Sequence, residues 1–170
     1  MREREGDVAA TDRFLRSIHG SLVRSLAGYV GDRSVAEDLA QEAMARFLAR
    51  PPGRTVHSPE AYLYTISLNV ARSWLRRRAV ERRASRRTVA AADFEVQQPS
   101  VEDDDIHEAM RRLPARQREA ISLRYLADLD VSRTALVMRC KEGTVRALTS
   151  QGIARLRREL GDYMSEVSDE

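Results

Sequence analysis

The sequence predicts an all-α protein in which two small helical domains are joined by a flexible linker and the C-terminal domain is a helix-turn-helix. The composition supports helices, because 32% of the 170 residues are charged, only 5% are aromatic and glycine occurs 8 times. A β-sandwich would require more aromatic and β-branched residues. Apolar residues also recur at helical spacing on both sides of a mid-chain segment that shows no period.

Three helices are predicted for the first domain, residues 10–87. Apolar residues spaced by four mark the first helix: Phe14, Ile18, Leu22, Leu26 and Val30. Gly31-Asp32 interrupts this stripe, and a second stripe follows: Val35, Leu39, Ala43 and Phe47. Prolines open a loop at residues 51–59 and end the second helix. The third helix then runs into three consecutive arginines and carries its own stripe: Leu63, Ile66, Val70 and Trp74.

Residues 88–104 form the predicted linker between the domains. They combine an alanine run with a Gln-Gln-Pro-Ser segment and several acidic residues, and no apolar period persists through them. Residues 93–108 hold 7 acidic and no basic residues, whereas residues 79–92 hold 4 basic residues and 1 acidic residue. This change from basic to acidic sequence is typical of a linker.

The second domain is predicted over residues 105–162. A helix begins near Pro114, and its spacing places Ile121 and Tyr125 on the inner face. Two more helices are predicted, Val131–Met138 with Asp130 as its N-cap, and Thr144–Leu160. The short joint between them contains Gly143. A pair of helices with such a turn is typical of a helix-turn-helix.

Several classes of protein are disfavoured by the sequence. No apolar stretch approaches the roughly 20 residues of a membrane span, and the N-terminus lacks the apolar core of a secretory signal. One cysteine, Cys140, and three scattered histidines offer no metal-ligand spacing. There is no glycine-rich phosphate loop and no catalytic constellation. We therefore expect a soluble, cytoplasmic protein that is not an enzyme, holds no metal or cofactor and does not insert into a membrane.

The last predicted helix has a packed side and an outer side. At 100° per residue, one narrow sector holds Val145, Thr149, Gly152, Leu156 and Leu160. The opposite sector holds Arg146, Ala147, Ser150, Gln151 and Ala154. Small and hydrogen-bonding side chains suit a helix that enters a DNA major groove, and the arginines at its end suit phosphates. Spacing alone leaves an ordinary solvated face equally open.

The predicted first domain contains two further groups of charged and polar residues. Eight arginines and a single acid, Glu81, lie between Arg72 and Arg87, which favours contact with a polyanion over a merely solvated face. The polar side of the second helix holds Asp38, Gln41 and Glu42. Spacing alone favours an ordinary exposed surface for these three.

Four short motifs, taken together, resemble the extracytoplasmic-function (ECF) sigma factors, the two-domain promoter-recognition subunits of bacterial RNA polymerase. The motifs are Ala36–Ala43, Pro59–Asn69, Leu113–Glu119 followed by Leu123–Leu126, and Glu142–Arg146. Their order and separations match the family over about residues 10–85 and 104–160. The resemblance equates the first domain with sigma region two and the second with region four.

The resemblance implies partners and site residues. It implies that the chain binds bacterial core RNA polymerase and promoter DNA, and it raises an anti-sigma factor as a further partner. The residues implied to dock on the polymerase clamp are Asp38, Gln41 and Glu42. Those implied to handle the minus-ten element are Asn69, Arg72, Arg76, Arg77 and Arg78. Those implied to read the minus-thirty-five element are Thr144, Arg146, Ala147, Ser150, Gln151 and Arg155.

Some positions near the recognition helix depart from the family pattern. Arg139 stands at a turn position where glycine is common, and a positive φ there would be strained. Lys141 stands ahead of the predicted recognition helix, so this helix lacks an obvious N-cap residue there. Basic residues are frequent in the family where Leu148, Gln151 and Ile153 stand, which predicts fewer charged base contacts.

Two other functions stay open at this point. A one-component regulator with a C-terminal helix-turn-helix would bind duplex DNA unaided and would not need the motif at residues 36–43. A helical adaptor would instead use the arginine run against an acidic protein or membrane surface. Steep salt dependence of duplex binding would distinguish phosphate contact from the adaptor.

Overall fold

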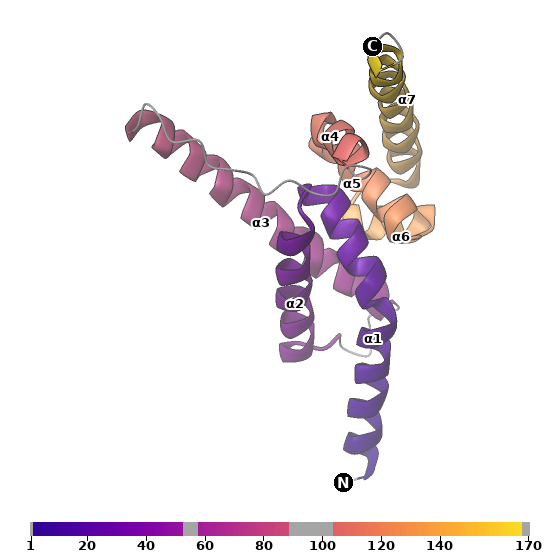
Figure 1. Cartoon of the computed structure of the whole chain (residues 1–170). Coiled ribbons are helices and arrows are strands. Elements are labelled where there is room, and N and C mark those ends of the chain that lie inside the picture. Colours follow the sequence, from indigo (N-terminus) through magenta and orange to yellow (C-terminus); the bar gives the residue numbers. More distant parts are fainter. Residues whose placement is uncertain (1, 53–57, 89–103, 168–170) are drawn as a thin grey trace.

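The computed structural model describes residues 2–52, 58–88 and 104–167, and over these residues it is all-α (Figure 1). The first part of the chain forms α1 (Arg2–Val30), α2 (Arg33–Ala49) and α3 (Pro59–Thr88). The second part forms α4 (Asp104–Arg112), α5 (Ala115–Ile121), the π-helical turn η1 (Ser122–Leu126), α6 (Val131–Met138) and α7 (Glu142–Val167). The prediction of an all-α fold is confirmed. The predicted linker lies, apart from its first and last residues, outside the described part of the chain.

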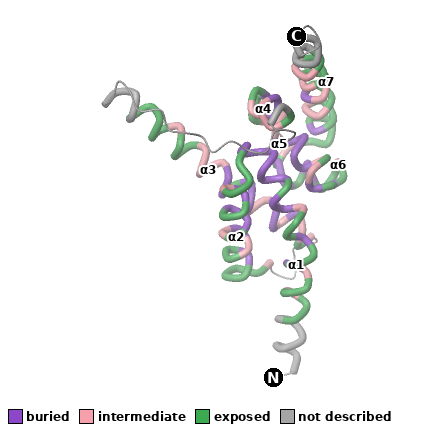
Figure 2. Tube along the Cα trace, in the orientation of Figure 1, coloured by how far each residue is buried: buried purple, intermediate pink, exposed green. Residues whose placement is uncertain are grey.

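The core of the first part forms where α1, α2 and α3 lie side by side, and Figure 2 shows the buried residues gathered there. The predicted apolar stripes supply it, with Leu22 and Leu63 fully enclosed. Asp32 caps α2, since its side chain accepts a hydrogen bond from the Val35 N–H at 3.0 Å. Gly31 allows the sharp turn before this cap, because its φ of +78° lies in the left-handed region that favours glycine.

The helix-turn-helix of the second part agrees closely with its prediction. α6 spans Val131–Met138, and the Asp130 side chain accepts a hydrogen bond from the Arg133 N–H at 2.8 Å. Arg139 ends α6 in the left-handed conformation, with φ 51° and ψ 53°. This is the turn position at which a positive φ would strain a non-glycine residue. The chain therefore accepts a strained arginine at the joint that orients α7.

Tyr125 corrects one prediction, because its side chain does not lie on the inner face. The residue is 57% exposed, whereas Ile121 is buried as predicted. α5 gives way to the wider turn of η1, in which the Ala127 N–H bonds to the Ser122 carbonyl. A π-helical turn inserts an extra residue and rotates the positions that follow it. Leu126 instead turns inward and contacts α1 at Gly28.

The two parts of the chain pack against each other. α1 contacts α4, α5 and η1, and α3 contacts α6. One buried apolar cluster runs from α1 into the second part through Leu123, Ala127 and Leu129. The approach at Gly28 is close, because a Cβ there would stand 2.1 Å from Leu126 Cδ1. The helical units predicted as separate domains therefore share a core in this structure.

Candidate polymerase and promoter interfaces

The polar residues of α2 lie on its outer side. Asp38 and Gln41 are exposed, while Leu39 and Ala43 of the same helix are buried against α1 and α3. Glu42 is half-buried and is held by an ion pair with Arg46, one turn further along. The three residues predicted to dock on the clamp thus form one accessible strip, which we call the α2 strip.

The second half of α3 projects away from the core and carries the arginine run (Figure 1). Arg76, Arg77 and Arg78 are exposed there. Arg76 donates a hydrogen bond to Ser73 Oγ at 2.9 Å, and the Arg78 guanidinium lies 5.1 Å from the centre of the Trp74 ring. Solvent-accessible guanidinium groups can bind phosphates with two parallel hydrogen bonds.

Asn69 lies about two helical turns before Arg76 on α3, beside a shallow hollow. The hollow has a volume of about 300 Å³, and Arg46, Arg50, Tyr62 and Ile66 also line it. The Tyr62 hydroxyl donates a hydrogen bond to the Arg50 carbonyl at 3.3 Å, which holds the ring at the edge of the hollow. An aromatic wall, two guanidinium groups and an amide are groups that can hold an unpaired base.

α7 presents the predicted outer face to solvent. The exposed residues include all six predicted for the minus-thirty-five element: Thr144, Arg146, Ala147, Ser150, Gln151 and Arg155. The opposite side packs on α5, with Val145 and Gly152 buried. Arg146 forms an ion pair with Glu142 at 2.8 Å, and Gln151 accepts a hydrogen bond from Gln117 at 3.3 Å. The packed and outer sides of this helix are therefore those that its spacing predicts.

Arg72 lies apart from the other arginines predicted for the minus-ten element. Its Nε and Nη2 each donate a hydrogen bond of 2.7 Å to a different oxygen of Glu119, in α5. Arg116 Nη1 donates to the same carboxylate at 2.7 Å, and the Tyr29 hydroxyl donates to it at 3.1 Å. Glu119 is only 2% exposed. Three donors from α1, α3 and α5 therefore converge on one buried carboxylate.

Comparison with known proteins assigns both parts of the chain. Residues 14–81 match Sigma-70 region 2, and residues 103–156 match Sigma-70, region 4. The ECF RNA polymerase sigma factor SigD of Mycobacterium tuberculosis is 31% identical to this chain, with 93% of this chain and 82% of SigD covered. The chain belongs to the ECF sigma factor family.

Other relatives support the assignment of this chain to the sigma factors. The RNA polymerase sigma-E factor of Streptomyces antibioticus is 29% identical, over 92% of this chain and 87% of the relative. The sigma factor RpoE of Bartonella quintana, solved in complex with the anti-sigma factor NepR, is 25% identical with a TM-score of 0.64, over 95% of this chain and 98% of that chain. The one-component regulator is not favoured. The described helices include none that is long and apolar enough to cross a membrane.

Two residues of this cluster, Tyr29 and Glu119, are not among those that the sequence pattern of the sigma factor indicates. Tyr29 sits among apolar residues near the end of α1, and Glu119 occupies a charged stretch that resembles an exposed helix face. Only its place three residues after Arg116 hints at a partner, and pairs at this spacing are common on solvated helices. No local signal in the sequence identifies Glu119 as a buried acid.

The electrostatics of this cluster keep Glu119 charged in the folded sigma factor. Burial alone would raise the pKa of a carboxyl group, but the hydrogen bonds and positive charges of Arg72 and then Arg116 outweigh it and hold the pKa of Glu119 below its ordinary value. Burial, and then the charge of Glu119, raises the pKa of Tyr29 to about 12. At neutral pH the cluster therefore contains an ionised carboxylate and a protonated hydroxyl donor.

Acid is expected to weaken the contact between the two regions of the sigma factor. The pKa of Glu119 is lower in the folded chain than in the unfolded chain, where it is about 4.3. The contribution of Glu119 to the free energy of unfolding is therefore complete above about pH 4.3 and is lost as the pH falls through the folded-state pKa. The difference in Tm between the wild type and Glu119→Gln should therefore shrink from neutral pH into the acid range. A difference that stays constant with pH would contradict this assignment.

Proposed function

We propose that this sigma factor uses three separate surfaces: the α2 strip for core RNA polymerase, the second half of α3 for the minus-ten element and the outer face of α7 for the minus-thirty-five element. The observation that supports this division is that the proposed polar residues of α2 and α7 face outward while the apolar sides of these helices are buried, and that Arg76, Arg77 and Arg78 are exposed on the projecting half of α3. We further propose residues 10–87 and 105–162 as the limits of the two functional domains. The sigma factor acts in the cytoplasm and catalyses no reaction itself.

The α2 strip suits a protein partner better than DNA. Asp38 and Glu42 carry negative charge, which repels phosphates, and Gln41 adds an amide that both donates and accepts hydrogen bonds. Complementary charge on a partner would speed association and set the register of docking. The polymerase clamp is the partner that the family implies.

The second half of α3 and the hollow beside Asn69 suit an opened promoter. Tyr62 offers a ring on which a flipped base can stack, and Asn69 can bond to the edge of that base. The arginine run would hold the neighbouring phosphates. The minus-ten element is proposed to be read in this way, with base recognition in the hollow and backbone contact along the helix.

The outer face of α7 suits duplex DNA. A helix of this size fits the major groove, where an arginine can form two hydrogen bonds with guanine and a glutamine can do so with adenine. Arg146 and Gln151 have the side chains for these contacts, and Arg155 lies toward the end of the outer face, where phosphates pass. Ala147 and Ser150 leave room for the helix to approach the bases.

Arg146→Ala is expected to weaken promoter binding by roughly 1–3 kcal/mol and to relax the sequence preference at one position, because one base-specific contact is lost. Binding to core polymerase should not change. Arg155→Ala is the matched control, since loss of a phosphate contact should weaken all sequences about equally. Normal transcription by Arg146→Ala from every promoter that the wild type uses would contradict the assignment of this face.

Reconstitution tests the whole proposal. The purified sigma factor should bind bacterial core RNA polymerase in a pull-down and direct run-off transcription from a specific promoter. Binding without promoter-specific transcription would remove the assigned roles of α3 and α7. We also propose an anti-sigma factor as a physiological partner, because the Bartonella relative was solved bound to one.

A further inference from the structure

We propose that Glu119 is a latch that keeps the free sigma factor closed and holds Arg72 away from DNA until the two regions separate. The Glu119 latch consists of Glu119 and its three hydrogen-bond donors, Arg72, Arg116 and Tyr29. The family resemblance implies that Arg72 binds the minus-ten element, and this role of Arg72 rests on the proposed function of α3. The closed arrangement itself does not depend on that function.

The Glu119 carboxylate binds Arg72 with the geometry that a phosphate group would use. Two parallel hydrogen bonds of 2.7 Å join the Arg72 guanidinium to the two oxygens of Glu119. This planar, two-point arrangement is the one in which arginine also binds phosphate. While Glu119 is in place, Arg72 cannot offer this edge of its guanidinium to the DNA backbone. Carboxylate and phosphate therefore compete for one arginine.

The donors to Glu119 belong to both regions, which makes the latch a bridge. Arg72 and Tyr29 come from α3 and α1 of region 2, and Glu119 and Arg116 come from α5 of region 4. The Arg118 guanidinium of α5 lies over the Tyr29 ring, 5.3 Å from its centre, and adds a further contact between the two regions. Separation of the regions would break the bonds from Arg72 and Tyr29 and leave only the bond from Arg116.

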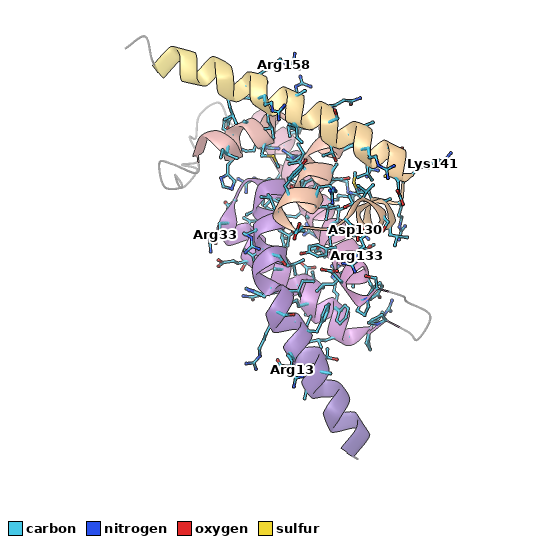
Figure 3. All side chains as sticks on the ribbon, turned by 90° about the vertical axis from the view of Figure 1, so that its right-hand side faces the viewer. Arg13, Arg33, Asp130, Arg133, Lys141 and Arg158 are labelled. Atoms are coloured by element: carbon cyan, nitrogen blue, oxygen red, sulfur yellow. The ribbon has the colours of Figure 1, made fainter. Side chains whose placement is uncertain are left out.

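A second polar bridge closes another part of the same interface. Arg133 of α6 forms an ion pair with Glu60 of α3 at 2.9 Å, and Figure 3 shows Arg133 directed toward the first part of the chain. Both of these residues are partly exposed. An exposed pair contributes little, so the buried carboxylate is the charged group on which closure depends most. The apolar contacts around Leu126 and Leu129 also hold the two regions together, but they do not depend on charge.

Closure leaves the polymerase-binding surface open. The α2 strip is accessible in the closed state, so polymerase can bind before the regions separate. If only a minor fraction of the molecules is in the open form that binds DNA, the apparent affinity for DNA is the affinity of the open form multiplied by that fraction. The latch would therefore lower promoter binding by the free sigma factor without hindering its capture by polymerase.

Glu119→Gln in the full-length chain tests the latch, because it removes the charge and keeps the shape. In small-angle scattering, the variant should have a larger radius of gyration than the wild type. Its affinity for a promoter duplex without polymerase should rise about tenfold or more, as expected if the open form is below about a tenth of the wild-type population. Glu108→Gln is the matched control, since Glu108 bonds to arginines within its own helix.

Arg72→Gln breaks the same bridge from region 2 and covers the case in which Glu119→Gln fails to fold. Both single variants should expand, and the double variant should expand no further, because the two residues act as a unit. Folded variants that stay as compact as the wild type and Glu108→Gln would overturn the proposal, as would expansion of Glu119→Gln without any gain in promoter affinity. Failure of the wild type to transcribe with polymerase would instead reject the proposed function, and scattering would still decide whether Glu119 closes the chain.

Discussion

Replacement of both Asp38 and Gln41 by alanine is expected to prevent the sigma factor from competing for core RNA polymerase. In an interface, each change leaves a buried partner on the polymerase without its hydrogen bond, at a cost of about 1–3 kcal/mol. The two losses sum to about 2–6 kcal/mol, so the double variant should bind roughly 30-fold to 20,000-fold more weakly, since each 1.4 kcal/mol is a factor of ten. Competition against labelled wild-type sigma factor for a limiting amount of polymerase measures this loss.

The same two substitutions are expected to leave the fold unchanged. Both side chains are exposed on α2, and exposed substitutions usually change stability by no more than about 0.5 kcal/mol. Helicity and Tm should match those of the wild type. Arg33→Ala combined with Ser34→Ala is a control, because both residues are exposed on α2 and precede the motif at residues 36–43. A folded Asp38 and Gln41 variant that competes as well as the wild type would show that the clamp assignment is wrong.

Replacement of Arg76, Arg77 and Arg78 by alanine is expected to impair formation of the open promoter complex and to flatten its salt dependence. Each phosphate contact that is lost lowers the slope of log affinity against log salt by about one, so the slope should fall by about three. Stability should change little, because all three side chains are exposed. Measurement of open-complex formation by the reconstituted holoenzyme across a salt series gives this slope.

A control with the same loss of charge separates phosphate contact from a general electrostatic effect. Arg13, Arg16 and Arg24 are exposed on α1, away from the arginine run; Figure 3 shows Arg13 on the part of α1 that projects from the core. Their triple alanine variant reduces the net charge equally, and it should leave the slope almost unchanged. Equal slopes for the wild type and both triple variants would mean that the arginine run is only a solvated face.

Most of the local structure of this sigma factor follows from the sequence. Apolar spacing places the buried stripes of α1, α2 and α3, because a helix turns each residue through a constant angle. Asp130 marks the start of α6, because a short acidic side chain can bond to the free N–H groups of the first turn. The same angular argument separates the packed and outer sides of α7. These properties depend only on residues within about one or two turns of each other.

The tertiary structure decided what the local pattern could not. Periodicity shows which face of a helix is buried, but it does not show which helix covers that face. The pairing of Arg72 with Glu119 joins residues 47 positions apart and exists only because α1, α3 and α5 meet. The exposure of Tyr125 likewise follows from one π-helical turn, which shifts a register that the sequence pattern assumes to be constant. Both depend on packing free energy shared between distant segments, and no single window of the sequence contains it.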